Sequence, residues 1–331
     1  MASAMGSATT GGDSCHGLAF GVTVDGLPGW GFSVLSLFEP EFAALRGRAG
    51  IDESLFRASL ARCMQWQAQG GKSSASFCKT LDERFVLKSM SRVELEHFVR
   101  IGTEYFARMA RGAPSCLARI FGVYRVALRT CEARPKAHVE AWVEPVADAL
   151  GPSLDVLADS LAQSGMPEGA PVASDEFLVV MENVLFGALG EFDAVYDLKG
   201  SQRSREACTG ATVRMDGNFG RERAVAPLFM PPGPRSELLE AARADTDWLV
   251  EHNIMDYSML LAVSEATGSL HVGIIDWLRP YTWDKKVESQ LKTRLEGLRR
   301  AKARVPTVIP PPDYARRFLA AIESYLPALP P

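Results

Sequence analysis

The alternation of apolar and polar positions predicts strands mainly in the first half of the chain. The segments that are apolar, rich in β-forming residues and bounded by turns are Gly31–Phe42, Ser76–Thr80, Phe85–Met90, Leu117–Ala127 and Phe177–Met181. Residues 81–84 (LDER) join the second of these segments to the third, which is typical of a β-hairpin.

Apolar residues three or four positions apart predict helices. Asp52–Gln69 and Arg92–Arg111 have this spacing, with Asp52 and Ser91 as N-terminal caps. The elements expected in the second half are the helices Arg235–Glu251 and Tyr314–Tyr325 and the strands Tyr196–Leu198, Leu260–Val263 and His271–Ile275. Strands followed mainly by helices predict an α+β fold with two lobes.

Two segments lack a regular pattern. Residues 1–30 are small and polar, and we expect a disordered leader there. Residues 129–174 are rich in Ala, Pro, Gly and acids, and we expect a mobile, dispensable insertion. The N-terminal lobe is therefore placed at about residues 31–181, insertion included, and the C-terminal lobe at about residues 182–326. Ligand sites often lie at such a junction.

Composition restricts the classes of function. The 331 residues carry a net charge of -4, so no general basic excess favours nucleic acid as a partner. An apolar run of about 20 residues, as a membrane-spanning helix needs, is missing, and the N-terminus lacks the order of a signal peptide. Six scattered cysteines without a CxxC pair argue against a disulfide framework or zinc site and fit a reducing cytosol.

The first candidate site lies around the hairpin. Gly71, Lys72, Ser73 and Ser74 form a loop whose backbone N–H groups can cradle phosphate oxygens, although the loop lacks the first glycine of a Walker A motif. Lys88 stands inside an apolar strand and needs an anion or solvent. Nucleotide kinases pair such a lysine with a glutamate on the next helix, here Glu94. An ordinary hairpin loop and a surface lysine are the alternative interpretations.

Polar residues also lie at the ends of apolar strands farther along the chain. Glu182 and Val184 lie where a strand ends like a hinge, whose backbone can bind the edge of a base. Asp256 and Asp276, about twenty residues apart at strand ends, suit a general base and a Mg²⁺ ligand. Turn and capping roles are the alternatives for all of these positions.

Two charged segments complete the candidates. Residues 195–201 (VYDLKGS) place Asp197 and Lys199 directly after a strand, where a plain turn is the alternative. Residues 285–304 combine basic residues with apolar helical spacing, which suits an anionic membrane surface or a phosphorylated headgroup; a solvated helix face is the alternative. The basic residues on which this reading depends are Lys285, Lys286, Arg299, Arg300, Lys302 and Arg304.

The segments QGGKSSASFCKTLDERFVLKSM, YDLKGSQRSR, NIMDYSMLL and GIIDWLRPYTWDKKVES follow one another in an order that resembles the catalytic domain of phosphatidylinositol phosphate kinases. The TWDKK stretch and the PTVI ending are most similar to the phosphatidylinositol 3-phosphate 5-kinase branch (PIKfyve-like) in its plant and algal form. This resemblance covers residues from about 30 to 326. It implies an N-terminal lobe with an antiparallel sheet, a mixed C-terminal lobe, and an ATP cleft between them.

The resemblance also implies roles for individual residues. Those that would bind ATP and Mg²⁺ are Lys88, its helix partner Glu94, Asp197, Lys199 and the metal ligand Asp276, with Arg203 or Arg205 nearby. Asp256 would orient and deprotonate the inositol hydroxyl. Residues 285–306 would form the activation loop that reads the lipid headgroup. Here Arg299-Arg300 stand where the family usually has Gly-Gly, and Met259 replaces a leucine.

The implied reaction is transfer of the ATP γ-phosphate to the 5-hydroxyl of phosphatidylinositol 3-phosphate. A 5-kinase acting on phosphatidylinositol or its 4-phosphate and a catalytically weak phosphoinositide-binding scaffold are the alternatives. A protein kinase is not expected, because HRD-type and APE-like segments are missing. We expect a peripheral enzyme of endosomal or vacuolar membranes, with an unknown recruiting protein, and without the zinc finger or chaperonin-like domain of many relatives.

Overall fold

The computed structural model describes residues 15–22, 29–66, 76–131, 172–187, 192–201, 205–208, 210–281 and 309–330. The chain forms two compact units. One comprises Met1–Phe56 and Ile120–Val180, and the other comprises Arg57–Arg119 and Met181–Pro331. The second unit resumes at Met181, close to where the C-terminal lobe was expected to begin. Residues 57–119, expected in the N-terminal lobe, also belong to this second unit.

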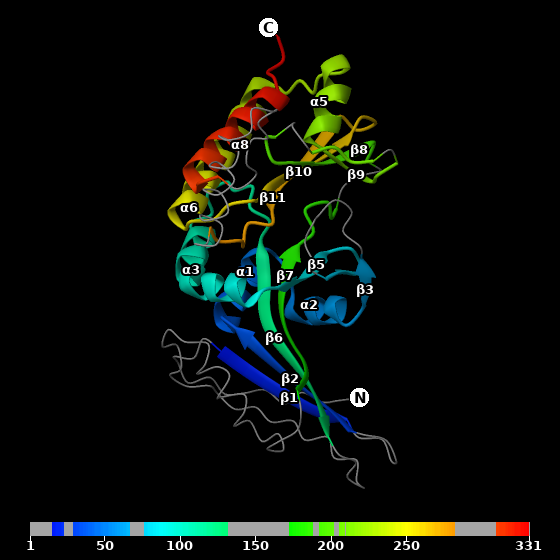
Figure 1. The fold of residues 1–331 in the computed structure, drawn as a ribbon, viewed down its shortest axis with the longest axis vertical. Helices are drawn as coiled ribbons and strands as arrows, with labels where there is room; N and C mark the ends of the chain where they lie inside the picture. The colour runs from blue at the N-terminus through cyan, green and yellow to red at the C-terminus, as the bar shows by residue number, and fades with distance from the viewer. Residues whose placement is uncertain are drawn as a thin grey trace, which may run out of the picture. The chain divides into compact units, whose positions relative to one another are not determined.

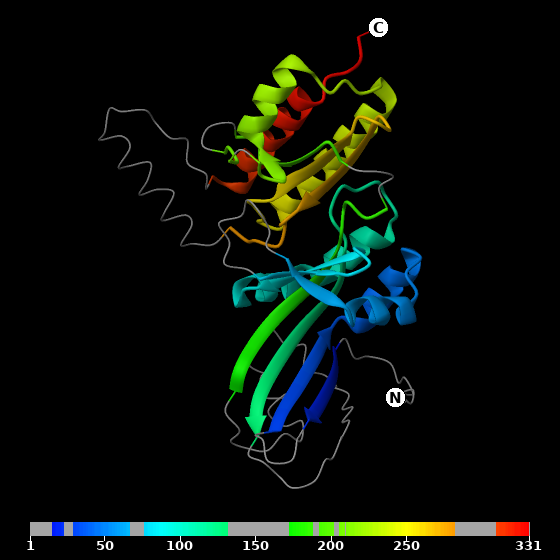
Figure 2. The same cartoon turned by 90° about the vertical axis from the view of Figure 1, so that its right-hand side faces the viewer.

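The first unit is built on long strands that lie side by side (Figure 2). Their order is β1 (Cys15–Val22), β2 (Gly29–Leu37), β6 (Ile120–Cys131) and β7 (Val172–Glu182), the last of which ends in the second unit. β2 pairs with β6 in antiparallel register, with Leu37 opposite Val123. These two side chains are fully buried, together with Phe42 of helix α1 (Glu39–Arg48).

A buried arginine joins α1 to this sheet. Arg46 donates a hydrogen bond to the Phe121 carbonyl at 2.7 Å and forms ion pairs with Glu39 and Glu53, while its own side chain is fully buried. Burial alone would lower the pKa of Arg46, but hydrogen bonds and charges from Glu53 and Glu39 outweigh it and raise the pKa. Arg46 therefore stays charged, as a buried cation with partners on three segments.

The first part of the second unit contains the expected hairpin, formed by Phe77–Thr80 and Phe85–Met90. After helix α2 (Glu53–Leu60), the strands β3 (Cys63–Trp66), β4 (Phe77–Thr80) and β5 (Phe85–Met90) pair in antiparallel register. Helix α3 (Arg92–Ala110) follows, and it begins with a capping box. In this box the Ser91 hydroxyl accepts a hydrogen bond from the Glu94 N–H, and the Glu94 carboxylate accepts from the Ser91 N–H. Ser91 is thus the cap that the sequence predicted.

The rest of the second unit is a mixed sheet with helices. The strand order is β11 (Ser269–Ile275), β10 (Ser258–Ser264), β8 (Ala194–Leu198) and β9 (Val213–Met215), with only the β8–β9 pair parallel. α5 (Asp216–Val225) follows β9 directly. α6 (Pro232–Glu251) and α8 (Pro311–Tyr325) lie side by side along the sheet (Figure 1). On α8, Phe318 packs its ring edge-on against Tyr257, next to β10.

The α+β class is confirmed, but several expected boundaries were wrong. β1 lies within the segment expected to be a disordered leader. The segment expected to be strand through Phe42 turns into α1 at Glu39, where Pro40 suits the first helical turn. The helix expected over Asp52–Gln69 ends at Leu60, and β3 follows because its backbone pairs with β4. Most of the expected insertion, residues 132–171, lies outside the described residues.

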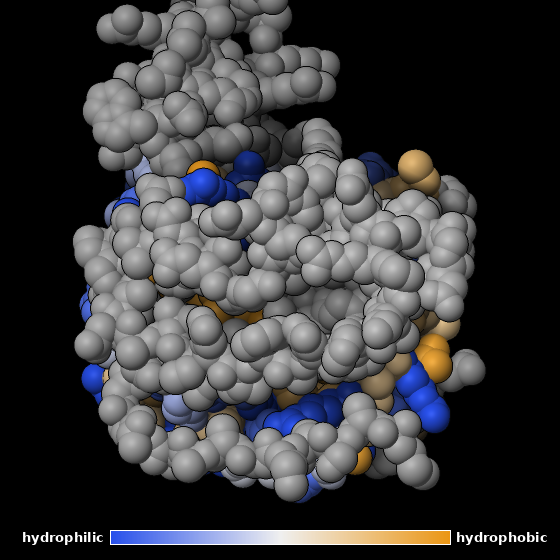
Figure 3. Space-filling view, turned by 90° about the horizontal axis from the view of Figure 1, so that it is seen from below, coloured by the Kyte–Doolittle hydropathy of each residue, from blue (hydrophilic) through white to orange (hydrophobic). Residues whose placement is uncertain are grey.

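The described helices include none that is long and apolar enough to cross a membrane. Seen from below, the described residues of the molecule show hydrophilic and hydrophobic side chains interspersed (Figure 3).

The capping box yields a prediction about stability. Replacing Ser91 by alanine removes the acceptor for the Glu94 N–H, so we expect a loss of about 1 kcal/mol in the free energy of unfolding. Urea denaturation followed by circular dichroism measures it. Ser324→Ala is the control, because that exposed hydroxyl donates to the Ala321 carbonyl in the last turn of α8 and caps no helix start. Equal losses in both variants would contradict the assigned cap.

Candidate functional site

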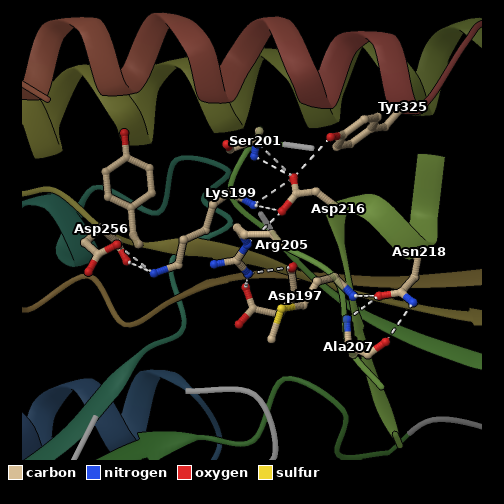
Figure 4. Close-up of polar contacts among 12 residues, drawn as sticks. Asp197, Lys199, Ser201, Arg205, Ala207, Asp216, Asn218, Asp256 and Tyr325 are labelled. Atoms are coloured by element: carbon tan, nitrogen blue, oxygen red, sulfur yellow. Dashed lines mark hydrogen bonds and ion pairs between the residues drawn. The ribbon is translucent and has the colours of Figure 1, made fainter. Parts of the chain in front are cut away.

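The lysine of the DLKGS segment meets the carboxylate of Asp256 (Figure 4). Lys199 follows β8, and its Nζ lies 2.8 Å from Asp256 Oδ1 and 2.6 Å from the Asp256 carbonyl oxygen. β8 and β10 are paired neighbours in the sheet, with Leu198 opposite Met259. The two residues, 57 positions apart in sequence, are therefore brought together by strand pairing.

Gly200 allows this turn to fit beneath α8. Its φ of 72° is left-handed, which glycine adopts most readily. A Cβ at this position would lie 3.0 Å from the Arg317 carbonyl oxygen and 3.0 Å from the Ala321 Cβ. The glycine thus serves two needs, backbone conformation and close approach to a helix.

A buried aspartate, which the sequence interpretation overlooked, fixes the same turn. Asp216 is fully buried at the start of α5, and its carboxylate accepts hydrogen bonds from the backbone N–H groups of Lys199, Gly200 and Ser201 at 2.8–3.2 Å. The Tyr325 hydroxyl donates to the same carboxylate from the end of α8. A buried carboxylate needs such donors, so Asp216 dictates the path of the backbone after β8.

Arg205 connects Asp216 to Asp197. Its Nε donates to Asp216 Oδ2 at 2.9 Å, and its Nη2 donates to Asp197 Oδ1 at 2.7 Å and to the Asp197 carbonyl. We expected Arg205 near the ATP phosphates or the substrate. The structure places its guanidinium between two carboxylates of its own chain, and the expected contact with phosphate or substrate stays a prediction. Nearby, the Asn218 side chain accepts a hydrogen bond from the Ala207 N–H and donates one to the Ala207 carbonyl (Figure 4).

Hydrogen bonds between residues 253–255 and residues 279–281 hold Asp256 in place. Its backbone is left-handed, with φ of 67°. The preceding residue, Met255, donates its N–H to the Arg279 carbonyl, and Asn253 exchanges hydrogen bonds with the backbone of Tyr281. The result places the Arg279 guanidinium 2.9 Å from Asp256 Oδ2. Asp256 therefore carries a cation on each of its carboxylate oxygens.

Lys88 is paired with Asp276 rather than with Glu94. The Lys88 side chain is buried, and its Nζ lies 2.7 Å from Asp276 Oδ1. Asp276 also has a left-handed backbone, with φ of 59°. The Glu94 carboxylate is engaged in the capping box of α3. The strand lysine thus has an acidic partner, but the partner comes from the end of β11.

Glu182 and Val184, the residues expected at the hinge, each contact another residue of the chain. Arg119 forms a bidentate ion pair with Glu182, at 2.9 and 2.7 Å. The hydrogen bond from Arg119 to Glu182 raises the pKa of Arg119, against the lowering effect of burial. Val184 packs closely against Gly273, where a Cβ would lie 2.6 Å from its Cγ2. Both side chains are thus engaged with other residues of the chain, and the role expected for the backbone at Glu182 and Val184 stays a prediction.

Behind the site lie buried tyrosines. Tyr314 on α8 donates its hydroxyl to the Tyr257 carbonyl, directly after Asp256. Burial raises the pKa of Tyr314, and the negative charge of Asp256 raises it further. Burial likewise raises the pKa of Tyr196 on β8, as does its hydrogen bond to Glu222. These hydroxyls stay neutral and act as donors.

Several predicted site residues lie outside the described residues: Gly71, Lys72, Ser73, Ser74, Arg203, Lys285, Lys286, Arg299, Arg300, Lys302 and Arg304. Among the described residues, no group of three or more His, Cys, Asp or Glu side chains is arranged to hold a metal.

Comparisons with known proteins agree with the motifs. Residues 60–270 and 264–325 match the family model described as phosphatidylinositol-4-phosphate 5-kinase. The chain is 35% identical over 90% of its length to 1-phosphatidylinositol-3-phosphate 5-kinase FAB1A of Arabidopsis thaliana, spanning 15% of that protein. It is 30% identical to the corresponding kinases of Saccharomyces cerevisiae, over 91% of this chain, and of Homo sapiens, over 84%. It spans 12% of each of these two proteins.

The close packing of Gly200 predicts a difference between two glycines. Gly200→Ala and Gly268→Ala both force alanine into a left-handed backbone, which costs about 1–2 kcal/mol. A Cβ at Gly268, where φ is 63°, would have no atom within 4 Å, whereas a Cβ at Gly200 would meet α8. We expect Gly200→Ala to lose an additional 1–3 kcal/mol or so of unfolding free energy through overpacking. Urea denaturation of both variants measures the difference, and equal losses would disprove the close contact.

Proposed function

The chain belongs to the family of phosphatidylinositol-4-phosphate 5-kinases, and we propose that it transfers the ATP γ-phosphate to the 5-hydroxyl of phosphatidylinositol 3-phosphate. The observation that carries this proposal is the contact of Lys199 with Asp256, which joins a cation and a carboxylate at the ends of neighbouring strands. The choice of lipid is supported by the relatives, which are named 1-phosphatidylinositol 3-phosphate 5-kinases.

Asp256 is the proposed general base. Its carboxylate would accept the proton of the inositol hydroxyl while the hydroxyl oxygen forms a bond to the γ-phosphorus. The bond between the γ-phosphorus and the bridging oxygen breaks, and ADP leaves with that electron pair. Lys199 would hold the carboxylate in place and balance negative charge in the transition state. Asp197, fixed by Arg205, would help to organise the phosphates from the other side of the turn.

Lys88 and Asp276 suit the nucleotide end of the site. Lys88 would exchange Asp276 for the ATP phosphates, which offer it more negative charge. Mg²⁺ is often held by one or two carboxylates together with substrate phosphates and water, so the single carboxylate of Asp276 fits it. Mg²⁺ bound there would neutralise charge on the transferred phosphoryl group. Glu94 would contribute indirectly, by fixing the start of α3 after the lysine strand.

Sequence alone supports the remaining roles. The backbone of the loop containing Gly71, Lys72, Ser73 and Ser74 would cradle phosphates, and the backbone at Glu182 and Val184 would bind the adenine edge. Arg203 and the basic residues of 285–304 would bind the lipid headgroup and the anionic membrane surface. On this proposal the protein works at the surface of endosomal or vacuolar membranes, recruited by another protein, and nucleic acid is not a partner.

The reaction is tested by incubating the purified chain with labelled ATP, Mg²⁺ and vesicles that each carry one phosphoinositide. We expect a 3,5-bisphosphate formed from phosphatidylinositol 3-phosphate and little product from phosphatidylinositol or its 4-phosphate. Preferred turnover of another lipid would reassign the substrate. Vesicle binding without any labelled product would refute the kinase activity.

The base assignment predicts a separation of turnover from nucleotide binding. Asp256→Asn should lower kcat by about 100- to 10,000-fold, the usual contribution of a general base. ATP affinity should stay within about threefold, because Asp256 acts on the hydroxyl. Lys88→Met should instead act mainly on nucleotide binding and reduce ATP affinity. Asp313→Asn, an exposed carboxylate paired with Arg316 on α8, is the matched control. Near-normal turnover by Asp256→Asn would exclude it as the base.

The basic segment predicts a salt-dependent membrane contact. Arg299→Gln/Arg300→Gln should weaken binding to anionic vesicles by about thirtyfold at low salt, because two basic residues near the surface contribute roughly 1 kcal/mol each. The loss should shrink as salt rises, because ions screen exposed charges. Arg221→Gln/Arg316→Gln removes two well-exposed charges elsewhere and serves as control. Equal effects of the two double variants in vesicle flotation would show that the segment is merely a solvated surface.

A further inference from the structure

The proposed base is shielded by two cations. Asp256 Oδ1 lies 2.8 Å from Lys199 Nζ, and Oδ2 lies 2.9 Å from Arg279 Nη1. A carboxylate held on both oxygens is less available to a hydroxyl proton than one held on a single oxygen. Asp256 therefore becomes more available as a base when one of the two cations moves away.

The two cations are held very differently. The Lys199 side chain is only 17% exposed, it also donates to the Asp256 carbonyl, and its backbone N–H is fixed by the buried Asp216. The Arg279 side chain is 47% exposed. Among the described residues, Asp256 is the only side chain with which the Arg279 guanidinium forms a hydrogen bond or ion pair. Water competes well for an exposed ion pair, so Arg279 is the cation that exchanges readily.

The backbone of Arg279 stays beside the base even if its side chain moves. The Met255 N–H donates to the Arg279 carbonyl, and the Asn253–Tyr281 hydrogen bonds hold the two segments together. If the guanidinium leaves Asp256, the Arg279 backbone still lies directly next to Asp256. Any anion that captures it must lie within one arginine side chain of the reacting hydroxyl.

We propose that Arg279 is a specificity-determining residue that leaves Asp256 to bind the phosphate monoester already present on the inositol ring of the lipid substrate. This inference rests on the proposed lipid kinase function. Guanidinium binds phosphate through two parallel hydrogen bonds. A phosphate monoester carries about two negative charges at neutral pH, against one for the carboxylate. The exchange would free Oδ2 for the hydroxyl proton, so the substrate phosphate would release the base.

This arrangement couples recognition to chemistry. A lipid without a ring phosphate would leave Arg279 on Asp256 and find the base half covered. A lipid with the ring phosphate would bind Arg279 and would meet an Asp256 whose Oδ2 is free. The ATP γ-phosphate is the other phosphate that could draw Arg279 away, and the experiment must separate these two sources.

Arg279→Gln tests the inference with kcat/KM measured on vesicles of phosphatidylinositol 3-phosphate and of phosphatidylinositol. We expect the preference for the 3-phosphate to fall by at least about tenfold, the usual value of one charged contact, with KM for ATP unchanged. Arg279→Lys should restore part of it. Arg316→Gln, an exposed arginine also paired with an aspartate, should leave the preference intact. Equal losses on both lipids, or a raised KM for ATP instead, would overturn the inference.

A binding measurement keeps this inference separate from the proposed reaction. Calorimetric titration with inositol 1,3-bisphosphate and inositol 1-phosphate should show a preference of the wild type for the bisphosphate, lost in Arg279→Gln. Inorganic phosphate that binds as tightly as the bisphosphate would overturn headgroup recognition. If the wild type forms no product from any lipid, the reaction proposal fails, while the titration still decides the role of Arg279. An unchanged preference in Arg279→Gln would refute that role.

Discussion

The second unit depends on the removal of one carboxylate from water. Asp216 is fully buried, and a charge in that position is tolerated only when donors surround it. Three consecutive backbone N–H groups, the Arg205 guanidinium and the Tyr325 hydroxyl supply them. These donors belong to the turn that follows β8, to a loop and to the end of α8. The requirement of a single buried anion thus ties several segments into one arrangement, and Lys199 takes its place as a result.

The acids of the proposed site share one feature. Each acid proposed to take part in the reaction is paired with a cation of the same chain, Asp197 with Arg205, Asp256 with Lys199 and Arg279, and Asp276 with Lys88. The side chains in these pairs range from 9% to 47% exposed. The pair of Arg205 with Asp197 fixes geometry, because separating it would leave a charge with little access to water. Lys88 and Arg279 are the cations proposed to exchange their carboxylate for phosphate, so rigidity and adaptability are divided between neighbouring residues.

The sequence predicted what depends on local pattern and failed where distant partners decide. The hairpin β4–β5 and the cap at Ser91 were predicted because their signals lie within a few residues. Asp216 was missed, since its role depends on a turn that lies fifteen or more residues upstream. Lys199 and Asp256 were both proposed from their motifs, but no local signal revealed that they touch. Glu94 was chosen for Lys88 by proximity in sequence, while the fold supplied Asp276 from 188 residues away.

The closure of the DLKGS turn by α8 bears on how this protein is made. Arg317 reaches the Lys199 carbonyl from 118 residues farther along the chain, and Gly200 rests against the same helix. During synthesis, β8 and its turn leave the ribosome long before α8 exists. The turn then lacks both the surface that covers Gly200 and the hydroxyl that completes the donors around Asp216. A nascent chain that stops before α8 would hold all of the proposed reacting residues without the contacts that shape this turn, so we expect the arrangement to form only after α8 has been made.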